Sequence, residues 1–472
     1  MAAQSPAVNR GPLGALTRRY ALLVGLLELA IAVPMPVLVL HMTGRGLDLA
    51  VIGLAFTLRA VFVVLLELPT GGLADAIGRR PVALASQLFT LASFAALLFV
   101  SGPFLALVYA LLQAIGSALH SGALEAWFVD ELQRLDPDVA LQPHLATAEV
   151  YQAAGMLIGT AVGGVLPKLT AGLDLPWPLS GFGIALFAGV LLRGLVWLFT
   201  YVLMQEPVKP QGGELVGVKA IPAILMDAGR LTKRIPRVRW LLVAAGASGL
   251  AMVSLETFWQ PIAAFTFGDS PDDSLPFAAL GTASGVAVLL GSLAVMRWGR
   301  LFPGGNVALA AASTLIRGAA MLLFASMASA WGLGVGLALA YFVLPTTNVP
   351  HYTLLHDTIP SSRRSSMLSV HSLVFYAGIA IASGPLGWLA TQMGPRPALA
   401  IAAMLTIGSS LAYVIVARLP QVRVDTTDPG TTVAPAQSAP AAATETELVA
   451  AVASLITSDG GFEAAVQEQL LE

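Results

Sequence analysis

The chain has 472 residues, of which 56% are hydrophobic and only 11% are charged, and its mean hydropathy is +0.79. Soluble domains carry about 25% charged residues, so this composition indicates a protein that lies mostly in a lipid bilayer. The net charge of -2 argues against nucleic acid as a partner. The sequence contains no cysteine, which excludes disulfides, thiolate nucleophiles and cysteine-ligated metals.

Twelve apolar runs follow one another along the chain, and each is long enough to cross a bilayer as a helix. In the first half they cover residues 20–41, 49–68, 81–101, 103–124, 146–168 and 179–203. In the second half they cover residues 240–266, 276–297, 306–328, 331–353, 366–391 and 397–418. No A-x-A-like cleavage site follows the first run, so we expect it to remain in the membrane.

The basic residues predict the orientation of these spans. Nineteen of the 25 lysines and arginines precede the first span, lie in alternate connections or follow the last span. The other connections hold only Arg45, Lys168 and Arg396. Because cytoplasmic connections carry an excess of Lys and Arg, we predict an all-α membrane protein with both termini in the cytoplasm.

Composition also predicts how the chain is divided. Residues 205–239 are polar, basic and interrupted by Pro and Gly, whereas residues after 420 are rich in Thr, Ala and Pro, which favours disorder. The predicted segments are a cytoplasmic N-terminal segment (1–19), a first six-helix bundle (20–204), a cytoplasmic linker (205–239), a second six-helix bundle (240–419) and a cytoplasmic, largely disordered tail (420–472).

A short charged turn joins the second and third predicted spans. Its small residues, among them Gly71 and Gly78, allow a tight turn close to neighbouring helices. Asp75 places a carboxylate at the edge of the membrane, where an arginine or a helix N-terminus could hold it. Arg79 and Arg80 mark the predicted cytoplasmic side.

The spacing G-x-L-A-D-x-x-G-R-R in this turn resembles the signature loop of the major facilitator superfamily. The resemblance extends over residues 18–420 and implies twelve helices in two six-helix halves. In that family the loop's aspartate and arginines, here Asp75, Arg79 and Arg80, form a conformational latch between helices. The candidate partners are acids after the fourth span and arginines before the eleventh: Glu125, Asp130, Arg363 and Arg364. The alternative is that the two loop arginines only set the topology.

Two further stretches refine the resemblance. Residues 67–70, Glu-Leu-Pro-Thr, are similar to the lead-in of bacterial drug-efflux members. Residues 155–164 resemble the antiporter signature G-x-x-x-G-P-x-x-G-G, with Thr160 in place of the proline. The glycines alone are equally explained by close helix packing. The family's usual arginine in the fourth span is replaced by Ala110.

Charged side chains within the spans are the candidates for solute or proton binding, because each needs a partner or a wet cavity. Glu28 and Arg59 lie on antiparallel spans at similar depth, so we expect them to meet near the midplane. Glu28 would then be a proton-coupling or cation-binding carboxylate, or half of a permanent structural pair. Arg193 and Arg317 lie in spans that are usually peripheral, and we expect structural pairing for both.

Polar residues in the seventh and eleventh spans give further candidates. Glu256, Trp259 and Gln260 could recognise a lipophilic cation through charge and cation–π attraction, or could form an aromatic belt at the headgroups. His371 is either a protonation site or a hydrogen-bonded packing residue. His351 and His356 are five residues apart, on different faces of a helix, which argues against a metal pair.

These observations predict a secondary active transporter that moves a small organic solute by alternating access. We favour proton-coupled efflux of a lipophilic or drug-like compound, with uptake of a nutrient such as a sugar or amino acid as the alternative. A membrane sensor or a membrane-embedded enzyme on the same scaffold is the alternative from another class. The sequence carries no phosphate-binding G-x-x-x-x-G-K-[ST] motif for ATP-driven transport. The expected partners are the solute, protons and the bilayer of a bacterial plasma membrane, with no cofactor, and we expect a monomer.

Overall fold

The architecture comes from a computed structural model, and its described residues are helical apart from short connections and one pair of two-residue strands. The structure describes residues 11–70, 73, 77–120, 123–204, 226, 229–230, 232–359, 364–420, 422–423 and 434–435. The strands β1 (Val422–Arg423) and β2 (Ala434–Pro435) pair antiparallel.

The first half of the chain begins with a broken span. The helices are α1 (Gly11–Ala32), η1 (Met35–Val37), α2 (Leu38–Gly44), α3 (Leu49–Thr70), α5 (Arg79–Leu98), α6 (Pro103–His120), α7 (Ala123–Leu135), α8 (Leu141–Thr170) and α9 (Gly183–Leu203). Helix α1 begins at Gly11, nine residues before the predicted start at residue 20. It ends before Pro34 and Pro36, because a proline has no N–H to donate to the helix and clashes with the preceding turn.

The second half has the same number of spans. Its helices are α11 (Pro236–Phe267), η3 (Pro271–Asp273), α12 (Leu275–Trp298), η4 (Gly299–Leu301), α13 (Gly305–Ser326), α14 (Ala330–Thr358), α15 (Arg364–Met393) and α16 (Pro395–Arg418). Helices α11, α14 and α15 carry prolines in their interiors.

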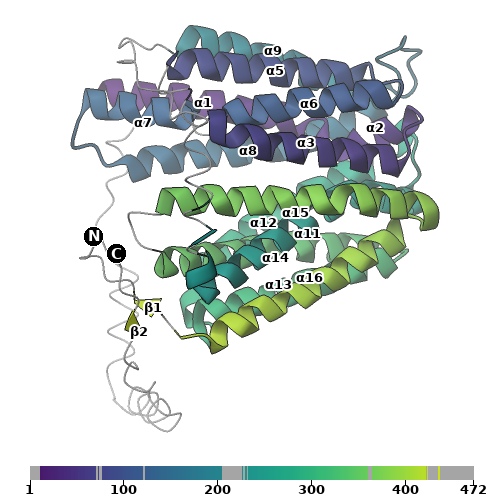
Figure 1. The fold of residues 1–472 in the computed structure, drawn as a ribbon. Coiled ribbons are helices and arrows are strands. Elements are labelled where there is room, and N and C mark those ends of the chain that lie inside the picture. Colours follow the sequence, from purple (N-terminus) through teal and green to yellow (C-terminus); the bar gives the residue numbers. More distant parts are fainter. Residues whose placement is uncertain are drawn as a thin grey trace, which may run out of the picture.

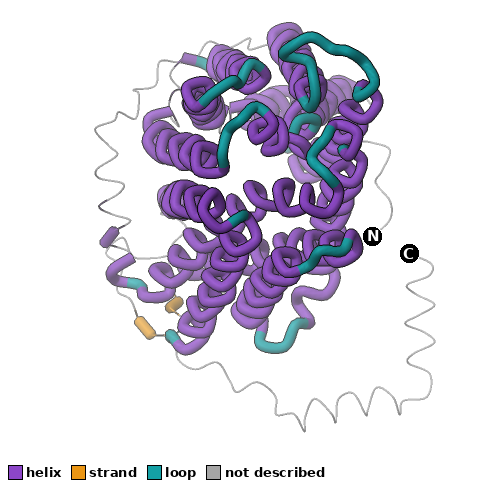
Figure 2. Tube along the Cα trace, turned by 90° about the vertical axis from the view of Figure 1, so that its right-hand side faces the viewer, coloured by secondary structure: helices purple, strands orange, loops and turns teal. Residues whose placement is uncertain are grey.

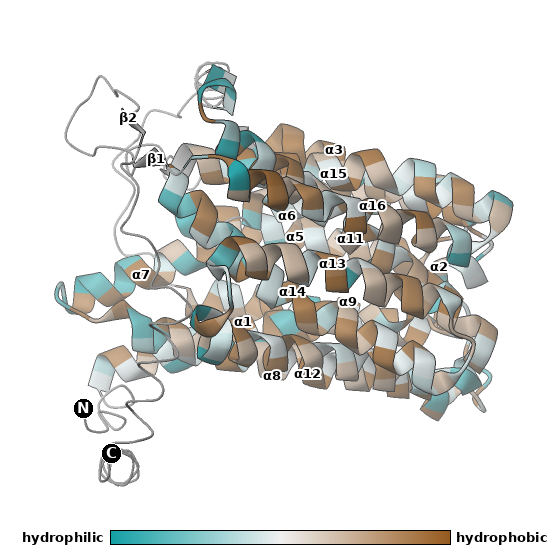
Figure 3. Ribbon diagram, turned by 90° about the horizontal axis from the view of Figure 1, so that it is seen from below, coloured by the Kyte–Doolittle hydropathy of each residue, from teal (hydrophilic) through white to brown (hydrophobic). Residues whose placement is uncertain are grey.

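Among the described residues, twelve helical segments are long and apolar enough to cross a membrane, as predicted. The two shortest predicted junctions are real breaks, since α5 ends at Leu98 and α13 ends at Ser326. Colouring by hydropathy shows apolar residues over the middle of the helices and polar residues gathered at their ends (Figure 3). This pattern is that of a bundle surrounded by lipid.

The two halves lie as two layers of roughly parallel helices (Figure 1). Helix α1 starts, and helix α16 stops, at one end of the bundle, which we call the terminal end. Helices α2 and η3 lie at the other end, which we call the opposite end. Figure 2 looks at the bundle from the opposite end, with its loops nearest the viewer. The halves meet mainly where α3 packs on α15 and where α8 packs on α12.

Helix α8 lies unusually close to α1 because it presents glycines to it. A Cβ added to Gly163 would lie 1.6 Å from the carbonyl oxygen of Val33, and one added to Gly155 would lie 2.1 Å from that of Gly25. Close packing between small residues is a common way to join membrane helices. Close packing against the α1 segment therefore explains Gly155 and Gly163.

Candidate functional site

A cavity of about 280 Å³ lies between the two halves, and we call it the central cavity. It is bordered by η1, α2, α3 and α6 of the first half and by α11 and α15 of the second half. Most of its lining is apolar, and the polar groups in it are few: Arg59, Tyr109, Glu256, Gln260 and Tyr376. An apolar cavity with a few placed polar groups is the usual form of a small-molecule site.

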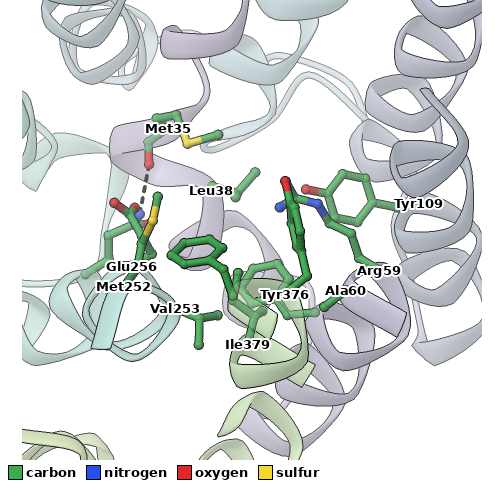
Figure 4. Close-up of a pocket in the computed structure, with 13 residues that line it drawn as sticks. Met35, Leu38, Arg59, Ala60, Tyr109, Met252, Val253, Glu256, Tyr376 and Ile379 are labelled. Carbon is green, nitrogen blue, oxygen red and sulfur yellow. Dashed lines mark hydrogen bonds between the residues drawn. The ribbon is translucent and has the colours of Figure 1, made fainter. Parts of the chain in front are cut away.

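Two opposite charges enter the central cavity from different halves. Arg59 comes from α3 and Glu256 from α11, and Figure 4 shows them on opposite sides of the pocket. The two groups are close enough to interact electrostatically, but they form no ion pair within 4.0 Å among the described residues. Nε of Arg59 is buried and has no hydrogen-bond partner in the described part of the chain. The cavity thus contains an under-satisfied cation and, across from it, an anion.

Glu256 is held in place from behind by the second half. Its carboxylate accepts a hydrogen bond from the hydroxyl of Tyr341 on α14. The buried Arg317 on α13 also acts on it electrostatically. Nη1 of Arg317 lies 3.5 Å from Oγ of Ser248, a distance at the limit for a hydrogen bond. These neighbours fix the carboxylate while it still faces the cavity.

Gln260, predicted as a solute-binding candidate, connects the two halves. Its Oε1 accepts hydrogen bonds from N–H groups of Val39 (2.9 Å) and Leu40 (3.3 Å), and its Nε2 donates to the carbonyl of Met35 (2.8 Å). The carbonyl of Met35 also accepts from the N–H of Leu38, but the N–H groups of Val39 and Leu40 lie in the first turn of α2 and have no partner within that helix. Gln260 satisfies them from the other half and so joins α11 to η1 and α2.

Trp259 does not line the central cavity. It is 5% exposed and packs against Phe277, with the ring centroids 6.1 Å apart. Glu256 and Gln260 lie four residues apart on one face of α11, whereas Trp259 points to a neighbouring face. Trp259 therefore does not line the cavity that Glu256 lines, and its part in solute recognition stays a prediction.

Glu28 and Arg59 do not meet, which corrects the predicted pair. Helix α1 packs against α8 and α9, whereas α3 packs against α15 and α6, so similar depth along the two helices does not bring their side chains together. Glu28 lines a different cavity of about 350 Å³ with Glu149, between α1, α8 and α12, which we call the Glu28 cavity. The charge of Arg193 acts on Glu28, and this arginine also lies over the ring of Phe94.

The loop residues of the proposed latch are only partly described. Gly71, Asp75 and Arg363 lie outside the described residues, and Gly78 precedes α5 with φ of 104°. Nε of Arg79 forms an ion pair with Asp130 at 2.8 Å, so these two predicted partners are in contact. Nη2 of Arg80 donates to the carbonyl of Tyr201, 2.7 Å away.

Two buried histidines of the second half lie together. Nε2 of His371 on α15 is 3.1 Å from Nε2 of His351 on α14. Nδ1 of His351 is 2.8 Å from the hydroxyl of Tyr413 on α16. These groups line a cavity of about 430 Å³, which we call the histidine cavity. It shares Met252, Phe375 and Tyr376 with the central cavity.

The comparison with protein families decides the identity of this architecture. The model of the Major Facilitator Superfamily matches residues 20–383, which is most of the chain. The chain belongs to this superfamily. It is therefore a multi-pass membrane transporter, and not an enzyme.

Three members of the superfamily show distant similarity to this chain. The uncharacterised MFS-type transporter YxaM of Bacillus subtilis (strain 168) is 19% identical over 394 residues, covering 83% of this chain and 93% of the relative. The crystal structure of the nucleoside transporter NupG has a TM-score of 0.69 and 14% identity, covering 86% of this chain and 99% of that chain. A bacterial homologue of the human lysosomal transporter Spinster has a TM-score of 0.63 and 16% identity, covering 88% and 98%. These structural similarities establish the superfamily fold.

Several contacts beside these cavities carry no signal in the sequence of this superfamily member. Tyr341 lies 85 residues from Glu256, and no motif or spacing connects the two. Ser372 on α15 donates to Oε1 of Glu67 on α3, 2.9 Å away and 305 residues apart. Such pairs depend on which helices are neighbours, and only the fold provides that information.

Proposed function

We propose that this transporter moves a small amphipathic organic solute through the central cavity by alternating access, in exchange for protons and in the direction of export. The main observation behind this proposal is the pair of opposite charges, Arg59 and Glu256, that face a largely apolar cavity from different halves. A solute bound between them would contact both halves at once. Binding energy could then favour one arrangement of the halves over another.

The apolar lining favours a solute with a lipophilic body. Phe56, Phe375 and Ile379 offer aromatic and aliphatic contact, and the lining tyrosines add hydroxyl groups. Export coupled to protons is supported by the glycine pattern of α8 and by residues 67–70, both of which resemble efflux members of the superfamily. The plasma membrane of a bacterium is the proposed location.

A second candidate is uptake of a zwitterionic nutrient such as an amino acid. The observation that favours it is the same charge arrangement, because a guanidinium suits a carboxylate and a buried carboxylate suits an ammonium group. Glu256 is hydrogen-bonded by Tyr341 and keeps one face toward the cavity.

A transport assay on the purified full-length protein tests these alternatives. Proteoliposomes with an imposed pH gradient would be offered a panel of radiolabelled lipophilic cations, zwitterionic amino acids and neutral sugars. The proposal predicts gradient-dependent movement of an amphipathic solute against the direction of proton flow. Movement of an amino acid together with protons would support uptake, and movement of neutral sugars alone would contradict both candidates.

A further inference from the structure

The histidine cavity contains a hydrogen-bonded chain that the transport site described above does not use. The chain runs from the hydroxyl of Tyr413 through both ring nitrogens of His351 to Nε2 of His371. The two imidazoles are 5% and 6% exposed. They come from α14 and α15, which follow one another along the chain in the second half.

The short contact between two Nε2 atoms limits the protonation states of the pair. Two N–H groups pointing at one another would clash, and two bare nitrogens would repel, so one proton lies between the rings. The remaining nitrogen of His351 donates to the hydroxyl of Tyr413 or accepts from it, according to its tautomer.

This arrangement can take up one additional proton without losing a hydrogen bond. When His371 donates through Nε2, its Nδ1 is a free acceptor, and it makes no hydrogen bond to the described part of the chain. Protonation there gives an imidazolium that keeps its hydrogen bond to His351, while His351 keeps its own with Tyr413. A second added proton would place two cations side by side. The capacity of the pair is therefore one proton.

The groups around the pair leave this proton without a direct counter-charge. The titratable side chains that line the same cavity are tyrosines: Tyr352 on α14, Tyr376 on α15 and Tyr413 on α16. Helix α11 contributes only Ala244, Ala245, Ser248 and Met252 to the lining, and α13 places Thr314 beside Tyr413. From the first half, Glu67 on α3 reaches this region and accepts a hydrogen bond from Ser372, the residue after His371.

The His351–His371 pair lies where an added proton can affect the contact between the two halves. The hydrogen bond from Ser372 to Glu67 joins α15 to α3, and a positive charge on the neighbouring His371 would attract that carboxylate. The shared lining with the central cavity gives solute and proton a common route.

We propose that the His351–His371 pair is the proton-binding site that couples this transporter to the pH gradient, with a stoichiometry of one proton. The proposal rests on the proposed transport function. The proton passes from water on one side to Nδ1 of His371, and it leaves to water on the other side after the halves have changed arrangement. No bond to the solute forms or breaks.

The proton itself can be observed without any solute. Full-length protein with ¹⁵N-labelled histidine would be titrated in lipid nanodiscs from about pH 3 to about pH 9 and followed by NMR, a range wide enough for imidazoles that burial makes harder to charge. We expect His351 and His371 to respond together and to bind one proton in total, and His371→Gln to abolish the joint response. Independent titration of the two rings, or no titration of either ring, would overturn the proposal.

A buried histidine outside the cavity supplies the matched control. His41 is 2% exposed, and its Nε2 lies 3.2 Å from the carbonyl of Leu97, a bond that glutamine can replace. His41→Gln should leave the joint response of the pair unchanged. A loss of the joint response in this variant would also count against the proposal, because the response would then not belong to the pair.

Transport separates coupling from solute movement. With a solute identified by the panel above, His371→Gln should reduce gradient-driven transport by about tenfold, while solute exchange without a gradient stays within about twofold of wild type. Unchanged gradient-driven transport, or loss of exchange as well, would contradict the coupling role. If no solute is transported but the pair binds its single proton, the proposed function fails and the proton site stands.

Discussion

The central cavity and the Glu28 cavity both lie where the two halves meet, but they differ in charge. The central cavity places Arg59 opposite Glu256, and Glu256 is held by Tyr341. The Glu28 cavity contains two carboxylates, Glu28 and Glu149, and no cation among its described lining residues. It is also the larger of the two, at about 350 Å³ against about 280 Å³.

This difference shows that size alone does not identify a binding site. A carboxylate fixed by a hydrogen bond and faced by a cation presents a defined geometry to a dipolar solute. Two carboxylates that share a cavity repel each other and favour water or a cation between them. We therefore assign solute binding to the central cavity, and the following variants test the contrast.

The largest loss of solute affinity is expected from Glu256→Gln. The change removes the anion of the central cavity, and hydrogen bonds to charged groups contribute about 1.5–3 kcal/mol. The solute concentration for half-maximal exchange should therefore rise by about tenfold to a hundredfold. Exchange of radiolabelled solute in proteoliposomes measures it.

Two control variants sharpen this result. Glu28→Gln makes the same chemical change in the Glu28 cavity and should alter the half-maximal concentration by less than about twofold. Tyr341→Phe removes one hydrogen bond and leaves the charge, so its effect should be smaller than that of Glu256→Gln. Equal changes in the half-maximal solute concentration for Glu256→Gln and Glu28→Gln would contradict the assignment of solute binding to the central cavity alone.

The next effect concerns the packing that keeps Glu28 away from Arg59. Gly163→Ala would force α8 away from α1, since its Cβ would lie 1.6 Å from the Val33 carbonyl oxygen. Overpacking of this kind costs about 1–3 kcal/mol, so thermal stability in detergent should fall clearly. Gly194→Ala in α9 is the control, because a Cβ there meets nothing within 4 Å. Equal melting temperatures for the two variants would show that the contact is not close.

Arg59→Gln should weaken solute binding less than Glu256→Gln, by about tenfold, because the hydroxyl of Tyr109 still lines the cavity from the same half. Arg59→Lys keeps the charge and should recover part of the affinity, although it loses the planar guanidinium. Competition between solute analogues with and without an anionic group would show which part of the solute Arg59 contacts. Equal losses for both analogues in Arg59→Gln would refute an anion-binding role.

The smallest change in stability is expected from a substitution at the protein surface. Asp130→Asn removes the ion pair with Arg79, in which the Asp130 side chain is 56% exposed. Exposed pairs contribute about 0.2–1 kcal/mol, so the melting temperature should barely change. Any marked effect of this variant on transport rate, with stability unchanged, would then indicate a conformational role for the pair rather than a structural one.

The twelve spans could be predicted from sequence because lipid requires long apolar helices, and the breaks after Leu98 and Ser326 lie at short junctions that contain Gly102 or Ser329. The contacts between functional side chains could be predicted less completely than the spans. Glu28 and Arg59 share a depth in the sequence pattern, but depth does not say which helices are neighbours. His371 is a candidate from sequence, whereas its partner His351 becomes evident only from the fold, which brings their Nε2 atoms to 3.1 Å.

The most direct test of solute binding in the central cavity uses the absence of native cysteine. Met252→Cys places a thiol at the central and histidine cavities, and Met156→Cys places one in the Glu28 cavity; the native side chains are 39% and 44% exposed. Transported solute at about ten times its Kd should slow alkylation of the first thiol by about tenfold and leave the second unchanged. Protection of the thiol at position 156 without protection at position 252 would contradict the assignment.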